Sequence, residues 1–204
     1  SSKMSWRDVF SQTLETDRVT LRPLLISDRG ALSEIAFDPS IWKYFVTRVE
    51  TPEDIDTFIE TGLADIAARR RAVFIVCDRS SGRIAGSMCY GNFAEIDRRL
   101  EIGWSWLGAD FRGTGLNGHA KFALLSHAFE TLDCERVEFK TDVLNEVARR
   151  GLIKIGAREE GVLRSYNFMP GGRRRDAIYY SILRAEWPGV KEELHRLNAG
   201  LING

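Results

Sequence analysis

The sequence predicts a mixed α/β (α+β) fold with one mostly antiparallel central sheet of about seven strands, flanked by helices. Short β-branched runs such as 72–77 lie between polar turns, which is typical of strands. Other stretches carry apolar residues at helical spacing, and the two kinds of segment alternate along the chain. The 204 residues fit one domain over 1–204, with an expected core from about 16 to 187 and a C-terminal helix over about 188–200.

The N-terminal part begins with a strand at Val19–Leu24 that ends near Pro23, followed by a helix over 28–36 with Ser27 as its cap. Thr51 followed by Pro52 and Asp54 predicts the start of a second helix. That helix carries apolar residues at helical spacing, namely Ile55, Phe58, Ile59, Leu63 and Ile66.

A hairpin is expected next, from strands over 72–77 and 84–93 joined by the polar turn 78–83. A strand over 100–107 follows, then a glycine-rich turn over 109–118 and a helix whose apolar stripe is Phe122, Leu125, Phe129 and Leu132. Next come a strand over 137–141 and a helix over 145–155 that ends at Gly156. The last elements are a strand starting at 161–165, a hairpin tip over 170–175, a strand over 177–183 and a helix over 190–197.

Composition excludes several classes of function. The 29 basic and 29 acidic residues balance, so net charge favours neither nucleic acid nor an anionic membrane as a partner. No apolar run approaches the roughly 20 residues that span a bilayer. The three cysteines are widely spaced, and His119 and His127 have no third ligand nearby, so neither a disulfide framework nor a metal is expected. We therefore expect a cytoplasmic protein.

The strongest local motif lies between a predicted strand and a predicted helix, and reads Arg112-Gly113-Thr114-Gly115-Leu116-Asn117-Gly118. A turn with three glycines lets successive backbone N–H groups face one point, and the start of the helix adds its positive end. Such a turn can bind a pyrophosphate, or it can simply connect a strand to a helix. The chain has no P-loop ending, and no Gly-x-Gly-x-x-Gly opens a βαβ unit near its N-terminus.

This turn resembles the acyl-coenzyme A pyrophosphate loop of the GNAT N-acetyltransferase superfamily, except that Asn117 stands where glycine or alanine is usual. The flanking segments are similar to the RimJ/RimL-like branch, which includes ribosomal-protein-alanine acetyltransferases. The matching segments are Glu101–Trp104 before the loop, Asn145–Arg150 and Lys154–Ala157 after the fifth strand, and Glu160–Arg164 in the strand that follows. The resemblance runs from about Thr16 to Trp187.

The resemblance implies a sheet that splays between its fourth and fifth strands, with the pantetheine arm of acetyl-coenzyme A in the gap. The expected cofactor is acetyl-coenzyme A as cosubstrate, without a metal. Its expected contacts are Arg112, Gly113, Thr114, Gly115, Leu116, Asn117, Gly118, Lys121 and Asn145. Lys121 can instead be a solvated helix lysine. Asn145 can cap a helix, contact the arm, or do both.

The reaction implied is direct attack by a neutral amine, which needs a base and no covalent enzyme intermediate. Glu101 is the expected general base, and the alternative is a structural ion pair with Arg99 or Arg83. Leu152 and Ala148 replace the tyrosine and serine of relatives, so Tyr166 or solvent must protonate the thiolate. Cys134 is expected to be a packed thiol.

Aromatic and polar residues in regions that wall the acceptor pocket in relatives are candidates for substrate binding: Trp42, Tyr44, Tyr90, Asn92 and Trp104. The alternative is that these side chains belong to the core. The run Arg173–Arg175 is expected to be a solvated turn, or else to attract an acidic acceptor or close over the cleft.

The leading hypothesis is therefore an N-acetyltransferase that acts on the primary amine of a protein N-terminus, peptide or small metabolite. The alternatives are a coenzyme A binding sensor with reduced catalysis and a nucleic-acid binder through the arginine run. An α-amine is favoured, because deprotonating a lysine side chain costs roughly 3 kcal/mol more at cytoplasmic pH. The acceptor's identity and a homodimeric state are left open.

Overall fold

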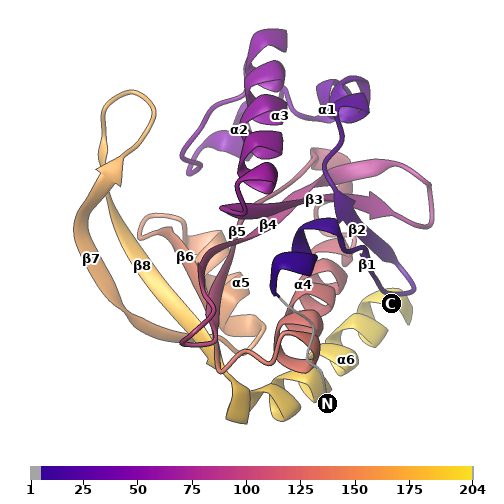
Figure 1. The fold of residues 1–204 in the computed structure, drawn as a ribbon, viewed down its shortest axis with the longest axis vertical. Helices are drawn as coiled ribbons and strands as arrows, with labels where there is room; N and C mark the ends of the chain where they lie inside the picture. The colour runs from indigo at the N-terminus through magenta and orange to yellow at the C-terminus, as the bar shows by residue number, and fades with distance from the viewer. Residues whose placement is uncertain (1–5, 204) are drawn as a thin grey trace.

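The computed structural model describes residues 6–203. Its strands form one eight-stranded sheet in the order β1-β2-β3-β4-β5-β6-β8-β7 (Figure 1). The strands are β1 (Leu14–Glu15), β2 (Val19–Pro23), β3 (Arg71–Asp78), β4 (Ile84–Ala94), β5 (Arg99–Leu107), β6 (Arg136–Asp142), β7 (Arg158–Phe168) and β8 (Arg174–Leu183). All neighbours are antiparallel except β5 and β6, which run parallel. The predicted mixed, mostly antiparallel sheet is confirmed, with the two-residue β1 added.

The helices are α1 (Arg29–Ile35), α2 (Pro39–Trp42), α3 (Pro52–Ala67), α4 (Leu116–Ser126), α5 (Glu146–Lys154) and α6 (Trp187–Asn203), with short 3-10 turns η1 (Trp6–Ser11), η2 (Ile26–Asp28), η3 (Ala109–Phe111) and η5 (Arg184–Glu186). The predicted cap of α3 is present, because the Thr51 side chain accepts from the Asp54 N–H and Asp54 caps in return. The predicted long helix after the glycine turn is α4 continued by a π-helical turn, η4 (His127–Thr131). Helix α2 was not expected from the sequence, because a single turn is too short to show apolar residues at helical spacing.

Two apolar clusters cover the two faces of the sheet. One cluster packs η1, α4 and α6 against the sheet, and the other packs α1, α2 and α3. The Tyr90 side chain is fully buried in the first cluster, where its hydroxyl donates to the Leu124 carbonyl in α4. Trp42 is 3% exposed in the second cluster, where its indole donates to the Ala36 carbonyl. Both residues belong to the core, which corrects their assignment to the acceptor pocket.

The parallel pairing of β5 with β6 covers only the first three residues of β5. It ends where Glu101 lies opposite Glu138. Beyond that point β6 pairs with β8 alone, and the rest of β5 pairs with β4 alone. The sheet therefore opens at the place where the sequence resemblance implies a splay.

A β-bulge lies in β5 directly beyond this opening. Cys89 pairs with Gly103 and Ser87 pairs with Trp106, so β5 carries one more residue than β4 across this stretch. Trp104 sits in the bulge with φ of 51°, a left-handed conformation that is rare for a bulky side chain. The strand thus changes which side chains face the opening.

Strands β7 and β8 form a long hairpin at the end of the sheet, seen at the left of Figure 1. Most β7 side chains are exposed, whereas those of β8 are mostly buried. The hairpin turn touches the segment after α2, because Arg48 Nη2 donates to the Pro170 carbonyl at 3.2 Å. Two segments more than a hundred residues apart are joined by this contact.

We expect Tyr90→Phe to lower the free energy of unfolding by about 1–2 kcal/mol, because the buried hydrogen bond from the Tyr90 hydroxyl to the Leu124 carbonyl is lost. Urea titration at pH 7 measures the change, with Tyr44→Phe, at a partly exposed ring, as the control. An unchanged stability in Tyr90→Phe would contradict the core assignment.

Candidate active site

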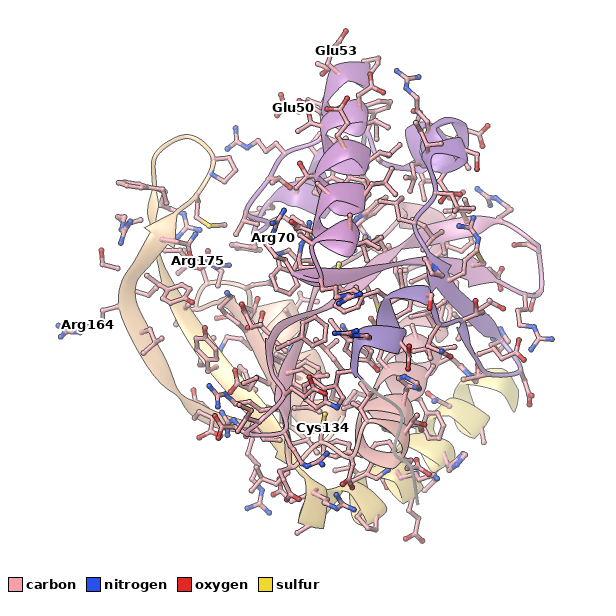
Figure 2. The ribbon with its side chains drawn as sticks, in the orientation of Figure 1. Glu50, Glu53, Arg70, Cys134, Arg164 and Arg175 are labelled. Atoms are coloured by element: carbon pink, nitrogen blue, oxygen red, sulfur yellow. The ribbon has the colours of Figure 1, made fainter. Side chains whose placement is uncertain are left out.

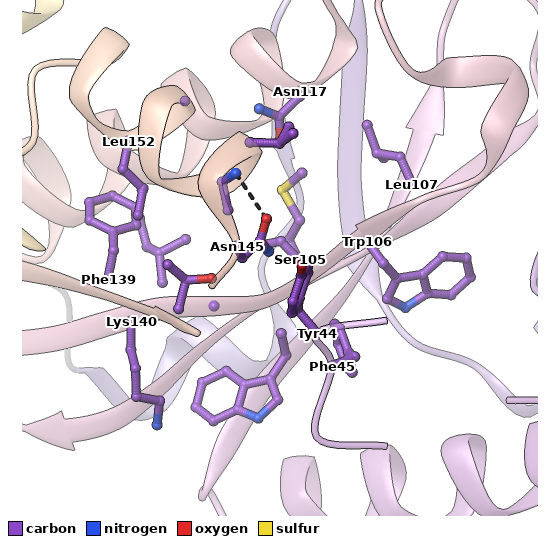
Figure 3. Close-up of a pocket in the computed structure, with 18 of the residues that line it drawn as sticks. Tyr44, Phe45, Ser105, Trp106, Leu107, Asn117, Phe139, Lys140, Asn145 and Leu152 are labelled. Carbon is purple, nitrogen blue, oxygen red and sulfur yellow. Dashed lines mark hydrogen bonds between the residues drawn. The ribbon is translucent and has the colours of Figure 1, made fainter. Parts of the chain in front are cut away.

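A cleft of about 680 Å³ lies where β5 and β6 separate. Its walls come from α2 and the segment after it, from β5 and β6, from the glycine turn and α4, and from α5, with one residue each from β4 and β8. Figure 3 shows side chains from these elements converging, including Asn117, Ser105, Asn145, Lys140 and Tyr44. The cleft thus runs from the glycine turn to the point where strand pairing stops.

The glycine turn has the geometry of an anion-binding loop. Gly113 and Gly115 have φ of 71° and 87°, a region that favours glycine, and Gly115 is the N-cap residue of α4. Within residues 6–203, the backbone N–H groups of Gly113, Thr114 and Gly115 donate to no other group. These donors and the positive end of α4 are available to a phosphate group.

The side chains of the turn divide between the cleft and the protein interior. Arg112, Gly113 and Asn117 line the cleft, and the Arg112 guanidinium is held by Ser40 Oγ at 2.9 Å. Thr114, Leu116 and Gly118 do not line it. The Thr114 hydroxyl donates to the Phe111 carbonyl at 2.6 Å, Leu116 is buried, and a side chain at Gly118 would meet Asn198 of α6.

Lys121 is buried beneath the cleft, so the alternative of a solvated lysine is wrong. Its Nζ donates to Ser105 Oγ at 2.6 Å, and no carboxylate in the described chain lies within ion-pair distance. Burial lowers the pKa of this amine to about 8. Lys121 therefore places a positive charge next to β5, with one hydroxyl as its hydrogen-bond partner and no carboxylate to pair with it.

Asn145 caps α5, because its Oδ1 accepts from the Ala148 N–H at 3.1 Å, the contact drawn dashed in Figure 3. The same side chain lines the cleft. Its amide nitrogen is therefore the part that remains for a second contact.

Glu101 lies at the inner end of the cleft and is 3% exposed. Its Oε1 accepts from Asn92 Nδ2 at 3.2 Å, and Lys140 Nζ lies 3.9 Å from Oε2. Burial raises the pKa of this carboxyl, although Lys140 and Asn92 oppose the shift. A buried carboxylate with a raised pKa is a better proton acceptor than an exposed one.

The structural ion pairs considered for Glu101 are made by other residues. Arg99 pairs with Asp97 and Glu138, and Arg83 pairs with Asp110. Lys140 is the basic neighbour instead, and sequence reasoning did not single it out. Alternation along β6 could not reveal Lys140, because Phe139, Lys140 and Thr141 are consecutive and all three line the cleft.

The proposed proton donor Tyr166 does not line the cleft. It lies on β7, where its hydroxyl accepts from the Tyr179 hydroxyl at 3.0 Å and its ring lies 4.9 Å from Lys140 Nζ. Leu152 and Ala148 do line the cleft. The cleft wall is thus apolar at the two positions where the sequence resemblance implies hydroxyl groups.

Of the acceptor candidates, Tyr44 and Trp104 line the cleft, whereas Asn92 approaches it only through Glu101. Cys134 is fully buried in the core, and burial raises the pKa of its thiol to about 12, as expected of a packed cysteine. His119 and His127 belong to no candidate metal site, because no group of three metal-binding side chains occurs in residues 6–203. No helix in this part of the chain is long and apolar enough to span a membrane.

The comparisons with known proteins agree with this geometry. Residues 18–158 match the family model for an acetyltransferase (GNAT) domain. The Bacillus subtilis protein named "Putative ribosomal N-acetyltransferase YdaF" is 31% identical over 183 residues, covering 86% of this chain and 96% of that protein.

Solved structures share the fold. A GCN5-related N-acetyltransferase from Brucella melitensis is 22% identical, with a TM-score of 0.85 over 92% of this chain and 86% of that one. Mycobacterium smegmatis RimJ in complex with CoA-disulfide is 22% identical, with a TM-score of 0.77 over 93% of this chain and 96% of that one.

The fold and the cleft define a GNAT-type acyltransferase. The chain belongs to the GNAT acetyltransferase family, in its RimJ/RimL-like branch, and is an N-acetyltransferase. Enzymes of this family use acetyl-coenzyme A as the acetyl donor.

Lys121 makes stability depend on pH. Its pKa is about 8 in the folded protein and near 10.4 in an unfolded chain, so between these values the unfolded chain binds a proton that the folded chain has lost. The contribution of Lys121 to the free energy of unfolding should therefore rise by roughly 3 kcal/mol from pH 8 to pH 10.4.

Lys121→Met should lack this rise, and Lys154→Met, at an exposed helix lysine, should keep it. Urea titrations across this pH range on the three proteins measure the difference. Parallel pH dependences for wild type and Lys121→Met would contradict a buried, unpaired charge.

Proposed function

We propose that the enzyme transfers the acetyl group of acetyl-coenzyme A to a primary amine by direct attack in a ternary complex. The observation that carries this proposal is the separation of β5 from β6 beyond Glu101, which leaves one edge of β5 without a strand partner. When bound, acetyl-coenzyme A supplies a thioester that an amine can attack. The glycine turn would hold its phosphates, and the free edge of β5 and Asn145 would hold its pantetheine arm.

Glu101 would accept the proton of the attacking amine, directly or through water. Its carboxylate lines the cleft, and Lys140 and Asn92 hold it in place. A backbone N–H near the Trp104 bulge is available for the developing negative charge, because this side of β5 has no strand partner. With Leu152 and Ala148 in the cleft wall, solvent is a sufficient proton source for a thiolate leaving group.

The acceptor class that fits best is an α-amine on a protein N-terminus, peptide or small metabolite. An α-amine is partly neutral near pH 7.5, so a single carboxylate base suffices, whereas a lysine side chain costs roughly 3 kcal/mol more to deprotonate. The similarity to YdaF, whose name refers to the ribosome, supports including ribosomal protein N-termini among the candidates.

A coenzyme A sensor with reduced catalysis is the second candidate, because Leu152 and Ala148 leave the cleft wall without the relatives' hydroxyl groups. Thiol release from acetyl-coenzyme A in the presence of an amine panel separates the two functions. Acceptor-dependent release supports the transferase, and tight acetyl-coenzyme A binding without release to any amine supports the sensor.

We expect Glu101→Gln to lower kcat by about 100-fold and to remove the acidic limb of the pH profile. In the wild type this limb should lie at higher pH than for an exposed glutamate, because burial raises the carboxyl pKa and the enzyme acts with Glu101 deprotonated. Calorimetry should give nearly unchanged acetyl-coenzyme A affinity. A variant with full turnover at every pH and a lower melting temperature would assign Glu101 a structural role instead.

Two substitutions separate the roles of Asn145. Asn145→Asp keeps a capping oxygen but loses the amide donor, so stability should stay near wild type while acetyl-coenzyme A affinity falls by about 1–2 kcal/mol. Asn145→Ala should lose both, with about 1 kcal/mol less unfolding free energy. Urea titration and calorimetry measure the two effects, and equal acetyl-coenzyme A affinity for Asn145→Asp and wild type would remove the cofactor contact.

A further inference from the structure

Arg175 is a buried guanidinium in the wall of the cleft. It lies on β8, is 5% exposed, and lines the same cleft as Glu101 and Lys140. Its Nε donates to Asn167 Oδ1 on β7 at 2.9 Å. Figure 2 shows Arg175 on the inner side of the β7–β8 hairpin, whereas Arg164 points away from the molecule. Burial lowers the pKa of Arg175, although a guanidinium stays charged near neutral pH.

The other two arginines of the run have partners elsewhere. Arg173 forms an ion pair with the fully buried Asp142. Arg174 is exposed and bonds to Ser165 through Nε at 3.0 Å, with its guanidinium over the Phe168 ring. In the described part of the chain, no carboxylate lies within 4.0 Å of Arg175, so its charge is buried without an ion-pair partner. A buried charge of this kind is costly unless something in the cleft pairs with it.

The cleft also has an excess of positive charge. Glu101 is its one acidic lining residue among those described, whereas its basic lining residues are Lys43, Arg112, Lys121, Lys140 and Arg175. Arg112 belongs to the glycine-turn end. At the Glu101 end, Lys140 is occupied partly by Glu101, at 3.9 Å. Arg175 forms one hydrogen bond, to the Asn167 amide, and the carboxylates of Asp142 and Glu101 act on its charge only from beyond ion-pair distance. An anionic group on the acceptor is therefore favoured at this end.

We propose that the acceptor carries a carboxylate near its amine and that Arg175 binds this carboxylate. This inference rests on the proposed function, because it names the class of amine that Glu101 would deprotonate. With Nε held by Asn167, the guanidinium is fixed in orientation and its remaining N–H groups are available for a carboxylate. Two sources share this chemistry: the α-carboxylate of a free amino acid, and the acidic side chain at the N-terminus of a peptide.

Matched acceptors test the proposal and separate its sources. Alanine is compared with alaninamide, and a peptide with N-terminal glutamate is compared with the same peptide beginning with glutamine. We expect wild-type kcat/KM, calculated for the neutral form of each amine, to favour the acidic member of one pair by at least 30-fold. We expect Arg175→Gln to remove this preference mainly through KM, and Arg175→Lys to keep part of it, since lysine retains charge without the planar fork. Arg174→Gln, on the neighbouring exposed arginine, should keep the wild-type preference.

A second measurement does not depend on turnover. Calorimetry in the presence of coenzyme A compares N-acetylalanine with N-acetylalaninamide, and acetylated glutamate peptide with acetylated glutamine peptide. Tighter binding of an acidic member to wild type, lost in a folded Arg175→Gln protein, supports the proposal. Equal binding and equal kcat/KM for both members of both pairs would overturn it while leaving the transferase function intact.

An absence of thiol release with every amine would instead count against the proposed function, and the calorimetric comparison would then decide the carboxylate site alone. If Arg175→Gln lowers the melting temperature and weakens acidic and amide ligands equally, Arg175 is a structural residue and the proposal fails.

Discussion

The site depends on one constraint: the hydrogen-bonded pairing of β5 with β6 stops at Glu101 and Glu138. Two parallel strands that begin side by side then follow different partners, β4 for one and β8 for the other. The gap leaves backbone groups of β5 without a strand, places Glu101 at its closed end, and leads at its open end to the glycine turn. Every residue assigned a chemical role here borders this gap or supports a residue that does.

Electrostatics in the cleft follow from the same opening. Lys121 and Arg175 are charged, buried and without carboxylate partners within ion-pair distance. This arrangement lowers the free energy of unfolding when no ligand is bound in the cleft. Asp142, by contrast, is buried with its own arginine. Both of these unpaired cations line the cleft, where a ligand can pair with them, which is the expected pattern for groups retained for binding rather than for stability.

The sequence predicted the features that depend on a few neighbouring residues, such as helix starts and tight turns. Thr51, Pro52 and Asp54 predicted the start of α3, and the glycines at 113 and 115 predicted a turn that requires positive φ. The sequence could not distinguish core from cleft among aromatic residues, because burial depends on which helix crosses which strand: Tyr90 and Trp42 bond to distant carbonyls, whereas Tyr44 lines the cleft. Arg175 was hidden for a similar reason, since Arg174 and Arg175 are successive arginines at the start of β8 and differ in the face of the strand to which each points.

The bulge in β5 has a consequence for how this enzyme tolerates change in length. Trp106 packs against Phe58 of α3 and Leu107 joins the cluster beneath α4, and both depend on the extra residue near Trp104. Deleting one residue between 103 and 105 would restore regular alternation and exchange the faces of the side chains on one side of the deletion. Homologues should therefore keep the number of residues in this stretch, whereas the exposed turn around Gly82 is free to vary in length.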